Sequence, residues 1–210
     1  MKKNRILFVS HCFPLSLHDH RGTFFSDILS ELSKLEIEVG VLAPRWEAHQ
    51  KLDWDFEDLT FELRRPYLSQ RQSSLKKLNT LLIFYWKILY LLVFKNSKLK
   101  KYNKIIFCWS FPSGILANLF NRKSKKIVWW LGTDFQLFRK YLRIMLFLIG
   151  RQTQHASCSL HIRSQVQELL LTHVKHLPIS YGYADLQSMK KNKKHYKQLK
   201  FVAVGRLEQV

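Results

Sequence analysis

Two loops of this sequence carry most of the residues that could bind a ligand, and the first follows an apolar run near the start. This loop, "SHCFPLSLHDHRGTFF" (residues 10–25), contains His11 at its beginning and Gly22 near its end. A glycine at a helix start lets a ligand approach the backbone, and the free N–H groups there favour anions. Because no Gly-x-Gly-x-x-Gly fingerprint is present, Gly22 is a weak signal by itself, and a tight turn that needs glycine explains it as well.

The histidines of the same loop could ligate a metal. His18 and His20 have the His-x-His spacing that suits imidazole ligation, with Asp19 between them and His11 upstream. No third and fourth ligand stand elsewhere at a familiar spacing, so we expect no metal site and interpret these side chains as solvated or facing substrate. His11, directly at the end of the apolar run, is the better candidate for contact with substrate.

The second loop of interest is "WWLGTDF" (residues 129–135). Gly132, Thr133 and Asp134 follow an apolar strand-like run, which places them at the edge of a sheet where ligands bind in α/β proteins. The alternative is structural, because Asp is a good N-cap and Asp134 could cap the next helix.

The order of apolar and amphipathic segments predicts the elements that position these loops. "RILFVS" is typical of a buried strand, residues 22–35 place their apolar side chains on one helical face, and "IEVGVLAP" predicts a second strand ending at Pro44, so residues 1–44 form a βαβ unit. Further strands are predicted near 59–63, 104–109, 126–131, 155–159 and 174–178, and helices near 74–95, 113–121, 135–150 and 161–172. This alternation predicts an α/β fold with a doubly wound, parallel, Rossmann-like sheet.

The charge composition restricts the partners of the protein. The sequence has 35 Lys plus Arg against 15 Asp plus Glu, a net charge of +20, which indicates anionic partners such as phosphorylated ligands, nucleic acid or an acidic membrane surface. Cys12, Cys108 and Cys158 are far apart and lie at apolar runs, so we expect neither disulfides nor a zinc cluster. The first apolar run is too short for a signal peptide, and a cytoplasmic location is expected.

The apolar stretch "LLIFYWKILYLLVF" (residues 81–94) requires a membrane test. As a helix it would be about 21 Å long, short of the roughly 30 Å hydrocarbon core, so it should not span a bilayer. Flanking lysines suit a helix lying in the interface beside anionic lipids, with Tyr85 and Trp86 at headgroup depth. The alternative is a helix that covers one face of the sheet, and both can hold at once.

A change of composition near residue 180 predicts a domain boundary. We assign residues 1–180 to a Rossmann-like domain and residues 181–200, which include the lysine-rich "MKKNKKHYKQLK", to a basic interdomain linker. "FVAVGRLEQV" (201–210) begins with an apolar run and is expected to be the first strand of a second domain, the rest of which is absent.

These motifs, in this order, resemble the N-terminal half of family 4 glycosyltransferases, which are retaining enzymes with two facing Rossmann-like domains, the GT-B fold. The resemblance covers nearly the whole chain. Its motifs are "ILFVSHCFP", "RGTFFSDILSELSKLEIEVGVLAP", "FPSGILANLF", "VWWLGTDF", "SCSLHIRSQVQELL", "LPISYGYADLQSM" and "FVAVGRLEQV", the last similar to the segment that opens the family's second domain.

The resemblance implies roles for residues on the donor side. Gly22 would lie near the donor phosphates, and Arg206 would pair with the donor pyrophosphate. A fork-shaped cation stabilises the charge that builds on a departing diphosphate without a metal, so no metal and no cofactor are expected.

On the acceptor side, the resemblance implies a sugar pocket bordered by Asp134 and its loop. Asp134 is the candidate catalytic residue, with Gly132, Thr133 and His11 in the pocket. The implied substrates are a nucleotide sugar and a glycan or lipid-linked acceptor of surface polysaccharide or lipopolysaccharide-type synthesis. Peripheral membrane association is expected, and no nucleic acid is expected.

The chain departs from the family in two places. Leu131 stands where the family often has a histidine before Gly-x-Asp, and leucine cannot hydrogen-bond to a sugar. The family's Lys-Gly pair and Glu-x7-Glu region would lie beyond residue 210, so the 210-residue chain alone is expected to have negligible transferase activity.

Two other functions fit parts of the sequence. The charge of +20 and the aromatic residues among the lysines suit a nucleic-acid-binding module, although no helix-turn-helix, zinc or RNA-recognition pattern is present. A sugar-nucleotide epimerase of similar two-domain fold is the other alternative, and it would form product without an acceptor.

Overall fold

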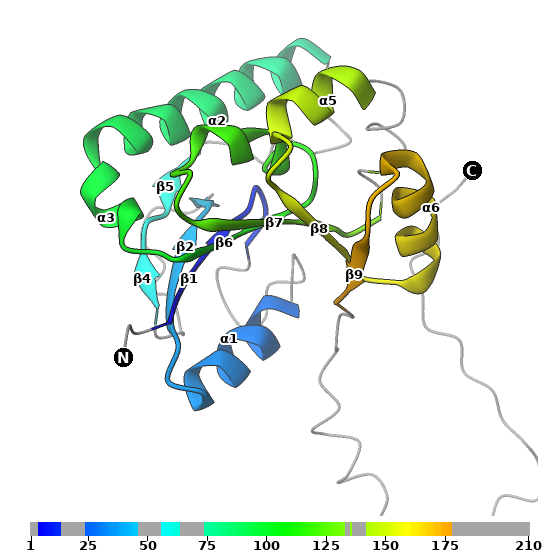
Figure 1. Ribbon diagram of the computed structural model, residues 1–210. Helices are drawn as coiled ribbons and strands as arrows, with labels where there is room; N and C mark the ends of the chain where they lie inside the picture. The colour runs from blue at the N-terminus through cyan, green and yellow to red at the C-terminus, as the bar shows by residue number, and fades with distance from the viewer. Residues whose placement is uncertain are drawn as a thin grey trace, which may run out of the picture.

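A seven-stranded sheet, flanked by helices, forms the centre of the computed structural model, which describes residues 4–13, 24–45, 56–63, 74–132, 135 and 142–177 (Figure 1). Strands are β1 (Arg5–Val9), β2 (Glu38–Leu42), β3 (Pro44–Arg45), β4 (Glu57–Asp58), β5 (Phe61–Glu62), β6 (Lys104–Cys108), β7 (Lys125–Trp130), β8 (Gln154–Ser157) and β9 (Val174–His176). Helices are α1 (Phe24–Lys34), α2 (Ser74–Phe94), α3 (Asn96–Lys100), the 3₁₀ helix η1 (Gly114–Leu119), α5 (Leu142–Ile149) and α6 (Leu160–Leu170).

The strand order of the large sheet is β4-β2-β1-β6-β7-β8-β9, and every neighbouring pair is parallel. β3 and β5 form a separate parallel pair. Strands buried on both faces need near-continuous apolar sequence, which explains why "ILFV" in β1 and "VGVL" in β2 are buried throughout. The predicted doubly wound parallel α/β sheet is therefore confirmed.

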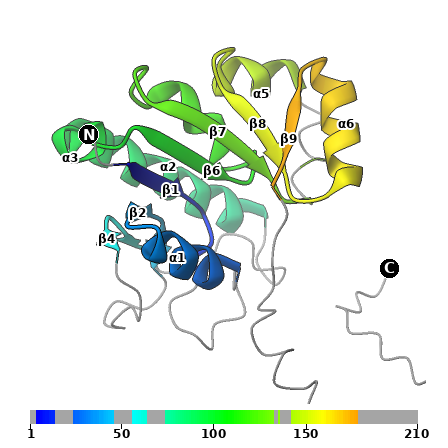
Figure 2. The same cartoon turned by 60° about the horizontal axis from the view of Figure 1, so that its bottom comes forward.

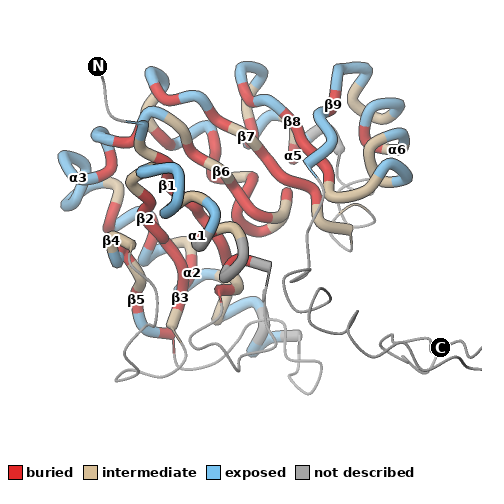
Figure 3. Tube along the Cα trace, turned by 90° about the horizontal axis from the view of Figure 1, so that it is seen from below, coloured by how far each residue is buried: buried red, intermediate tan, exposed pale blue. Residues whose placement is uncertain are grey.

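Helices cover both faces of the sheet (Figure 2), and a cluster of buried apolar side chains lies on each face. On one face, Phe25 and Leu29 of α1 pack with Phe8 of β1. On the other face, residues of α2, η1, α5 and α6 form a second cluster with the strands; examples are Phe84 and Ile88 of α2. Seen from below, the strands are mostly buried while the outer sides of the helices are exposed (Figure 3). Among the described residues, no helix is long and apolar enough to cross a membrane.

The element boundaries differ from the sequence predictions in three places. The second strand, predicted to end at Pro44, ends at Leu42, and Pro44 begins β3. Of the strand predicted near 59–63, only Phe61 and Glu62 form a strand, β5; Leu59 and Thr60 separate it from β4. The Asp58 carboxylate accepts hydrogen bonds from the Thr60 N–H at 2.8 Å and hydroxyl at 2.6 Å, and this side-chain turn competes with ladder pairing. The helix predicted near 113–121 is a 3₁₀ helix, η1. The linker and second domain predicted after residue 180 lie outside the described residues.

Candidate functional site

The strand order places a topological switch point at β1. From β1 the chain adds β2 and then β4 on one side of the sheet, and it later returns to add β6, β7, β8 and β9 on the other side. In open α/β sheets, ligands bind in the crevice outside the carboxyl ends of the strands where the order reverses. The loops after β1 and β6 therefore form the first candidate site, and we call this side of the sheet the carboxyl edge.

The loop after β1 is held by a turn at Ser10. The Ser10 N–H donates to the Leu42 carbonyl at 3.0 Å, which ties the end of β1 to the end of β2. The Ser10 hydroxyl donates to the Cys12 carbonyl and accepts from the Cys12 N–H at 3.1 Å. Ser10 is fully buried, and its bonds fix the position of His11 between them.

His11 is a neutral, buried imidazole at the switch point. Its side chain is 2% exposed, and its ring lies 4.5 Å from the Trp109 ring, centroid to centroid, at an interplanar angle of 64°. Burial lowers the pKa of His11 to about 3. At neutral pH this side chain therefore presents one N–H donor and one nitrogen acceptor and carries no charge.

Trp109, directly after β6, has a backbone conformation that is rare for a bulky residue. Its φ is 69°, in the left-handed region that costs most L-residues free energy. The Trp109 N–H donates to the Trp129 carbonyl at 2.9 Å, and the Trp109 carbonyl accepts from the Gly114 N–H at 3.0 Å. Strain of this kind is held by its surroundings and is concentrated at functional sites, so Trp109 is a candidate binding residue.

The segment between Trp109 and η1 buries two hydroxyl groups. Ser110 and Ser113 are both fully buried. Within the part of the chain that the structure describes, the Ser113 hydroxyl has no hydrogen-bond partner. A buried polar atom without a partner costs free energy, and a ligand hydroxyl that pairs with Ser113 would remove that cost. The close packing explains why residue 114 is a glycine. A β-carbon there would lie 3.1 Å from both the Trp109 carbonyl oxygen and a Val128 methyl group.

Hydrogen bonds also follow the ends of the next two strands at the carboxyl edge. Gly132, after β7, has a φ of 129°, which only glycine adopts without strain, and its carbonyl accepts from the Phe135 N–H at 3.0 Å. After β8, the Ser159 hydroxyl caps α6 by accepting from the Ile162 N–H at 3.2 Å. The N-terminal end of α6 thus faces this edge and adds a partial positive charge to it.

The structure brings two of the predicted site residues to the same edge. His11 follows β1 and Gly132 follows β7, with the Trp109 loop of β6 between them. The other four predicted residues, Gly22, Thr133, Asp134 and Arg206, lie outside the described residues. In the described ranges, no group of three or more His, Cys, Asp or Glu is arranged to hold a metal ion.

The described groups at the carboxyl edge are suited to recognising a neutral polar ligand. They are an imidazole held neutral by burial, an indole, and a buried hydroxyl. Mostly apolar surroundings with a few fixed polar groups are typical of small-molecule sites. No Asp or Glu occurs in residues 10–13, 109–113, 131–132 or 158–159, so proton transfer by a carboxylate would have to come from outside these loop residues.

Sequence reasoning missed Trp109 and Ser113 as site residues. The segment "FPSGILANLF" is one of the motifs of the resemblance and includes the helix predicted near 113–121, but it provides no predicted site residue. A usable signal was present, because "WSFPSG" places small residues and proline directly after a buried strand. The left-handed backbone of Trp109 and the unpaired hydroxyl of Ser113 depend on tertiary packing and are visible only in the structure.

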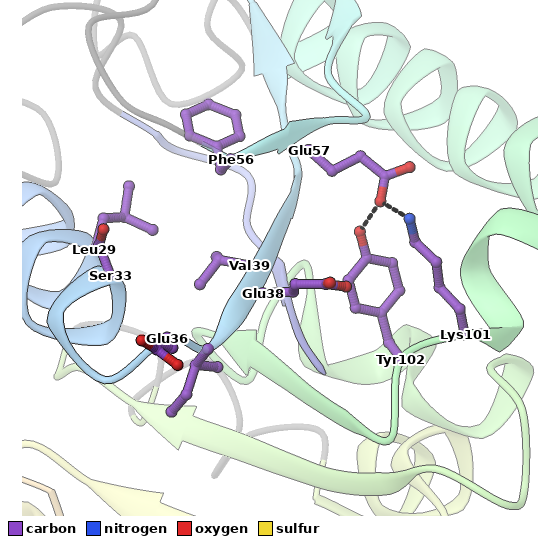
Figure 4. Close-up of a pocket in the computed structure, with 10 residues that line it drawn as sticks. Leu29, Ser33, Glu36, Glu38, Val39, Phe56, Glu57, Lys101 and Tyr102 are labelled. Carbon is purple, nitrogen blue, oxygen red and sulfur yellow. Dashed lines mark hydrogen bonds and ion pairs between the residues drawn. The ribbon is translucent and has the colours of Figure 1, made fainter. Parts of the chain in front are cut away.

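A pocket of about 550 Å³ lies at the opposite, amino edge of the sheet, between α1, β2, β4 and the segment after α3 (Figure 4). Leu29, Val39 and Phe56 provide apolar surface, and Glu57, Lys101 and Tyr102 provide polar groups. It was not predicted, and it lies away from the strand ends where ligands bind in this class of fold.

The polar groups of this amino-edge pocket satisfy one another. The Tyr102 hydroxyl donates to the Glu57 carboxylate, which also pairs with the Lys101 ammonium group (Figure 4). Burial pushes the pKa of Glu57 upward, but the hydrogen bonds from Lys101 and Tyr102 outweigh it and hold that pKa below its ordinary value. Burial and the Glu57 contact raise the pKa of Tyr102. This self-contained network is structural.

The fold and the carboxyl edge define a Rossmann-like α/β domain with a candidate small-molecule site at its switch point. No protein-family model matches this chain, and no curated protein sequence matches it.

Proposed function

We propose that this chain is the acceptor-side domain of a retaining glycosyltransferase of the family 4 type, which acts on a nucleotide sugar and a glycan or lipid-linked acceptor. Support comes from the order of the motifs along the chain and from the fold. The motifs resemble those of the family in sequence order, and the parallel sheet is the architecture that the resemblance implies.

One observation carries the proposal: buried, uncharged polar groups lie beside an aromatic ring where β1 and β6 end. His11 is neutral at physiological pH, Trp109 lies against it, and the Ser113 hydroxyl is buried nearby in the chain. Sugars offer many hydroxyl groups, which pair with such donors and acceptors, and apolar C–H faces, which pack on aromatic rings.

The proposal includes a place of action at the cytoplasmic face of a membrane. Among the described residues, none of the three cysteines forms a disulfide, which suits a reducing compartment. The charge of +20 favours an anionic surface, where a lipid-linked acceptor would be found. Peripheral association, rather than a membrane span, is the proposed mode.

Sugar recognition at the switch point tests the proposal. Saturation-transfer NMR of the purified chain with a panel of soluble oligosaccharides should show transfer to at least one of them. Trp109→Ala should weaken that binding about tenfold or more, because it removes the ring against which the sugar packs.

The matched control is Trp86→Ala, which removes an indole that is 70% exposed on α2 and should leave sugar binding unchanged. If Trp109→Ala does not fold, as judged by circular dichroism, Ser113→Ala provides the second test. Absence of transfer to every carbohydrate, together with tight binding of random oligonucleotides at physiological salt, would contradict the proposal and favour a nucleic-acid-binding module.

A further inference from the structure

The outer side of α2 exposes an unusual amount of apolar surface. Phe84, Ile88 and Leu91 are buried against the sheet, as expected for the inner side of a helix. Nine large apolar side chains of α2 are nevertheless 40% to 79% exposed: Leu75, Leu78, Leu82, Ile83, Trp86, Leu89, Tyr90, Val93 and Phe94. Soluble monomers rarely expose a continuous apolar surface of this kind unless it binds something.

Lysines continue this surface where α2 ends. Lys95, Lys98 and Lys100 are exposed on and beside α3, which follows α2 directly (Figure 1). In the described part of the chain, these three lysines form no ion pair. The sequence contains no Asp or Glu between Leu63 and Thr133, so the positive charge of this region has no acidic residues along the chain to offset it.

A basic pocket extends the charge to the neighbouring strand ends. Arg5, Lys100, Lys101 and Lys123 line a pocket of about 410 Å³ at the amino edge. Arg5 pairs with Glu38 and Lys101 with Glu57, whereas Lys100 and Lys123 form no ion pair with described residues. Anionic groups approaching α3 therefore meet cations on more than one element.

The combination of positive charge and apolar surface favours one kind of binding partner for the outer face of α2 over the others. A second copy of the chain would bring two lysine clusters together, and a net charge of +20 on each copy opposes this. The phosphates of a nucleic acid could pair with the lysines, but the aliphatic side chains of α2 would remain exposed to water. An anionic bilayer satisfies both, because apolar and aromatic side chains enter the headgroup boundary while lysines contact the lipid phosphates.

We propose that the outer face of α2, with the lysines of α3, is a docking surface for an anionic lipid bilayer. The surface comprises Trp86, Tyr90, Phe94, Lys95, Lys98 and Lys100. This inference specifies the membrane contact included in the proposed function and rests on it for its biological purpose. The physical argument itself depends only on the exposed side chains of this surface.

This docking surface is connected to the switch point through α2. Tyr85, on the same helix, has its hydroxyl oxygen 3.4 Å from the Pro112 carbonyl oxygen, in the loop between Trp109 and η1. A helix with its side chains is about 10 to 12 Å across, so a bilayer against the outer face of α2 would lie about one helix diameter from that loop. A lipid-linked acceptor could therefore reach the site without leaving the membrane surface.

Vesicle flotation of the purified full chain tests the docking surface. Vesicles of phosphatidylcholine and phosphatidylglycerol in equal parts should bind the protein, and vesicles of phosphatidylcholine alone should bind it much more weakly. Lys98→Gln with Lys100→Gln should lower the partition coefficient about fivefold per lysine, hence about 25-fold. Trp86→Glu with Phe94→Glu should lower it about tenfold or more.

The control variants make the same kinds of substitution at positions outside the docking surface. Leu35→Glu alters an apolar side chain that is 68% exposed beyond α1, on the other face of the sheet, and should leave binding unchanged. Arg163→Gln with Lys175→Gln removes two charges on α6 and β9 and should reduce binding less than the α3 pair does. Circular dichroism of each variant confirms that it is folded.

Equal binding to both kinds of vesicle, or binding that the α2 and α3 variants leave unchanged, would overturn the inference. A stable dimer in sedimentation velocity that Trp86→Glu dissociates would overturn it in favour of self-association. No nucleotide sugar is present in these measurements, so a failure of the transferase proposal would leave their outcome unaffected.

Discussion

The polar groups at the two edges of the central sheet differ in how they are paired. At the amino edge, Tyr102, Lys101 and Glu57 bind one another, so their charges and hydrogen bonds are satisfied within the protein. At the carboxyl edge, His11 is held neutral by burial, Trp109 has a strained backbone and the Ser113 hydroxyl has no partner among the described residues. The pocket at the amino edge is therefore best explained by packing, and the polar groups at the carboxyl edge by a ligand.

The largest expected effect concerns two buried histidines, His11 near the carboxyl edge and His155 near the start of β8. Burial lowers their pKa values to about 3 and about 4, from an ordinary value near 6.5. Because the unfolded chain binds these protons first, stability present above about pH 6.5 is lost as the pH falls toward those values. Between pH 7 and pH 5, the free energy of unfolding should fall by about 4 kcal/mol, about 2 from each histidine.

Urea unfolding at the two pH values measures this loss. His155→Gln keeps an acceptor for the Trp130 indole N–H, which lies 3.2 Å from the His155 ring nitrogen, and should remove about half of the pH dependence. His11→Asn should remove the other half and should also weaken sugar binding, which His155→Gln should not. A wild-type stability that is constant from pH 7 to pH 5 would contradict the burial of both rings.

The next largest effect on the free energy of unfolding is expected at Gly40, the middle residue of β2, over which Tyr102 of the amino edge packs. A β-carbon there would overlap the Tyr102 ring, which passes directly over this glycine. Gly40→Ala should therefore lower the free energy of unfolding by about 1 to 3 kcal/mol, as measured by urea unfolding, and leave sugar binding intact. In the double variant with Tyr102→Ala, the loss should be smaller than the sum of the two single losses, and strict additivity would show that Tyr102 is not the obstacle.

Two buried serines test whether the two edges differ in the pairing of their hydroxyl groups, with an expected difference in the free energy of unfolding of about 1 kcal/mol. The Ser124 hydroxyl, at the amino edge, donates to the Tyr102 carbonyl at 2.8 Å, so Ser124→Ala should cost about 1 kcal/mol of stability. Ser113→Ala removes a hydroxyl that no described residue pairs with, so it should leave stability unchanged or raise it slightly while it weakens sugar binding. A stability loss of equal size in both variants would mean that the two edges do not differ in this way.

The smallest expected effect concerns Glu57. Its pKa is lowered in the folded state, so the carboxylate contributes stability above its unfolded pKa and loses it as the pH falls through the folded value. Since the side chain is 29% exposed, we expect less than about 1 kcal/mol. Glu57→Gln should reduce the acid sensitivity of unfolding below pH 5 by that amount, and a variant with unchanged acid sensitivity would show that the Tyr102 and Lys101 contacts do not stabilise the carboxylate.

The fold was predictable because its signal is local. Apolar runs such as those of β1 and β6, separated by amphipathic helices, are sufficient to predict a parallel sheet from the sequence. The error near residues 59–63 arose where Asp58 bonds to Thr60, a side-chain competition that hydrophobic pattern does not register.

The site was only partly predictable. His11 and Gly132 could be placed at strand ends from the sequence, and the structure places them there. Trp109 could not be recognised, because its conformation depends on hydrogen bonds to Trp129 and Gly114 that join separate segments. Burial of the Ser113 hydroxyl and lowering of the His11 pKa likewise depend on packing, which residue types alone do not specify.

The pairing of β1 with β6 also determines when this part of the sheet can form during synthesis of the chain. Ile6 is opposite Lys104, so the two central strands of the switch point are encoded about 100 residues apart. At a synthesis rate of about 5 to 20 residues per second, β1 waits roughly 5 to 20 s for this partner to be made. During that interval β1 can pair with β2 but has an open edge on its other side. The switch point is thus a late feature of folding, completed only after α2 and its exposed apolar side chains have already been synthesised.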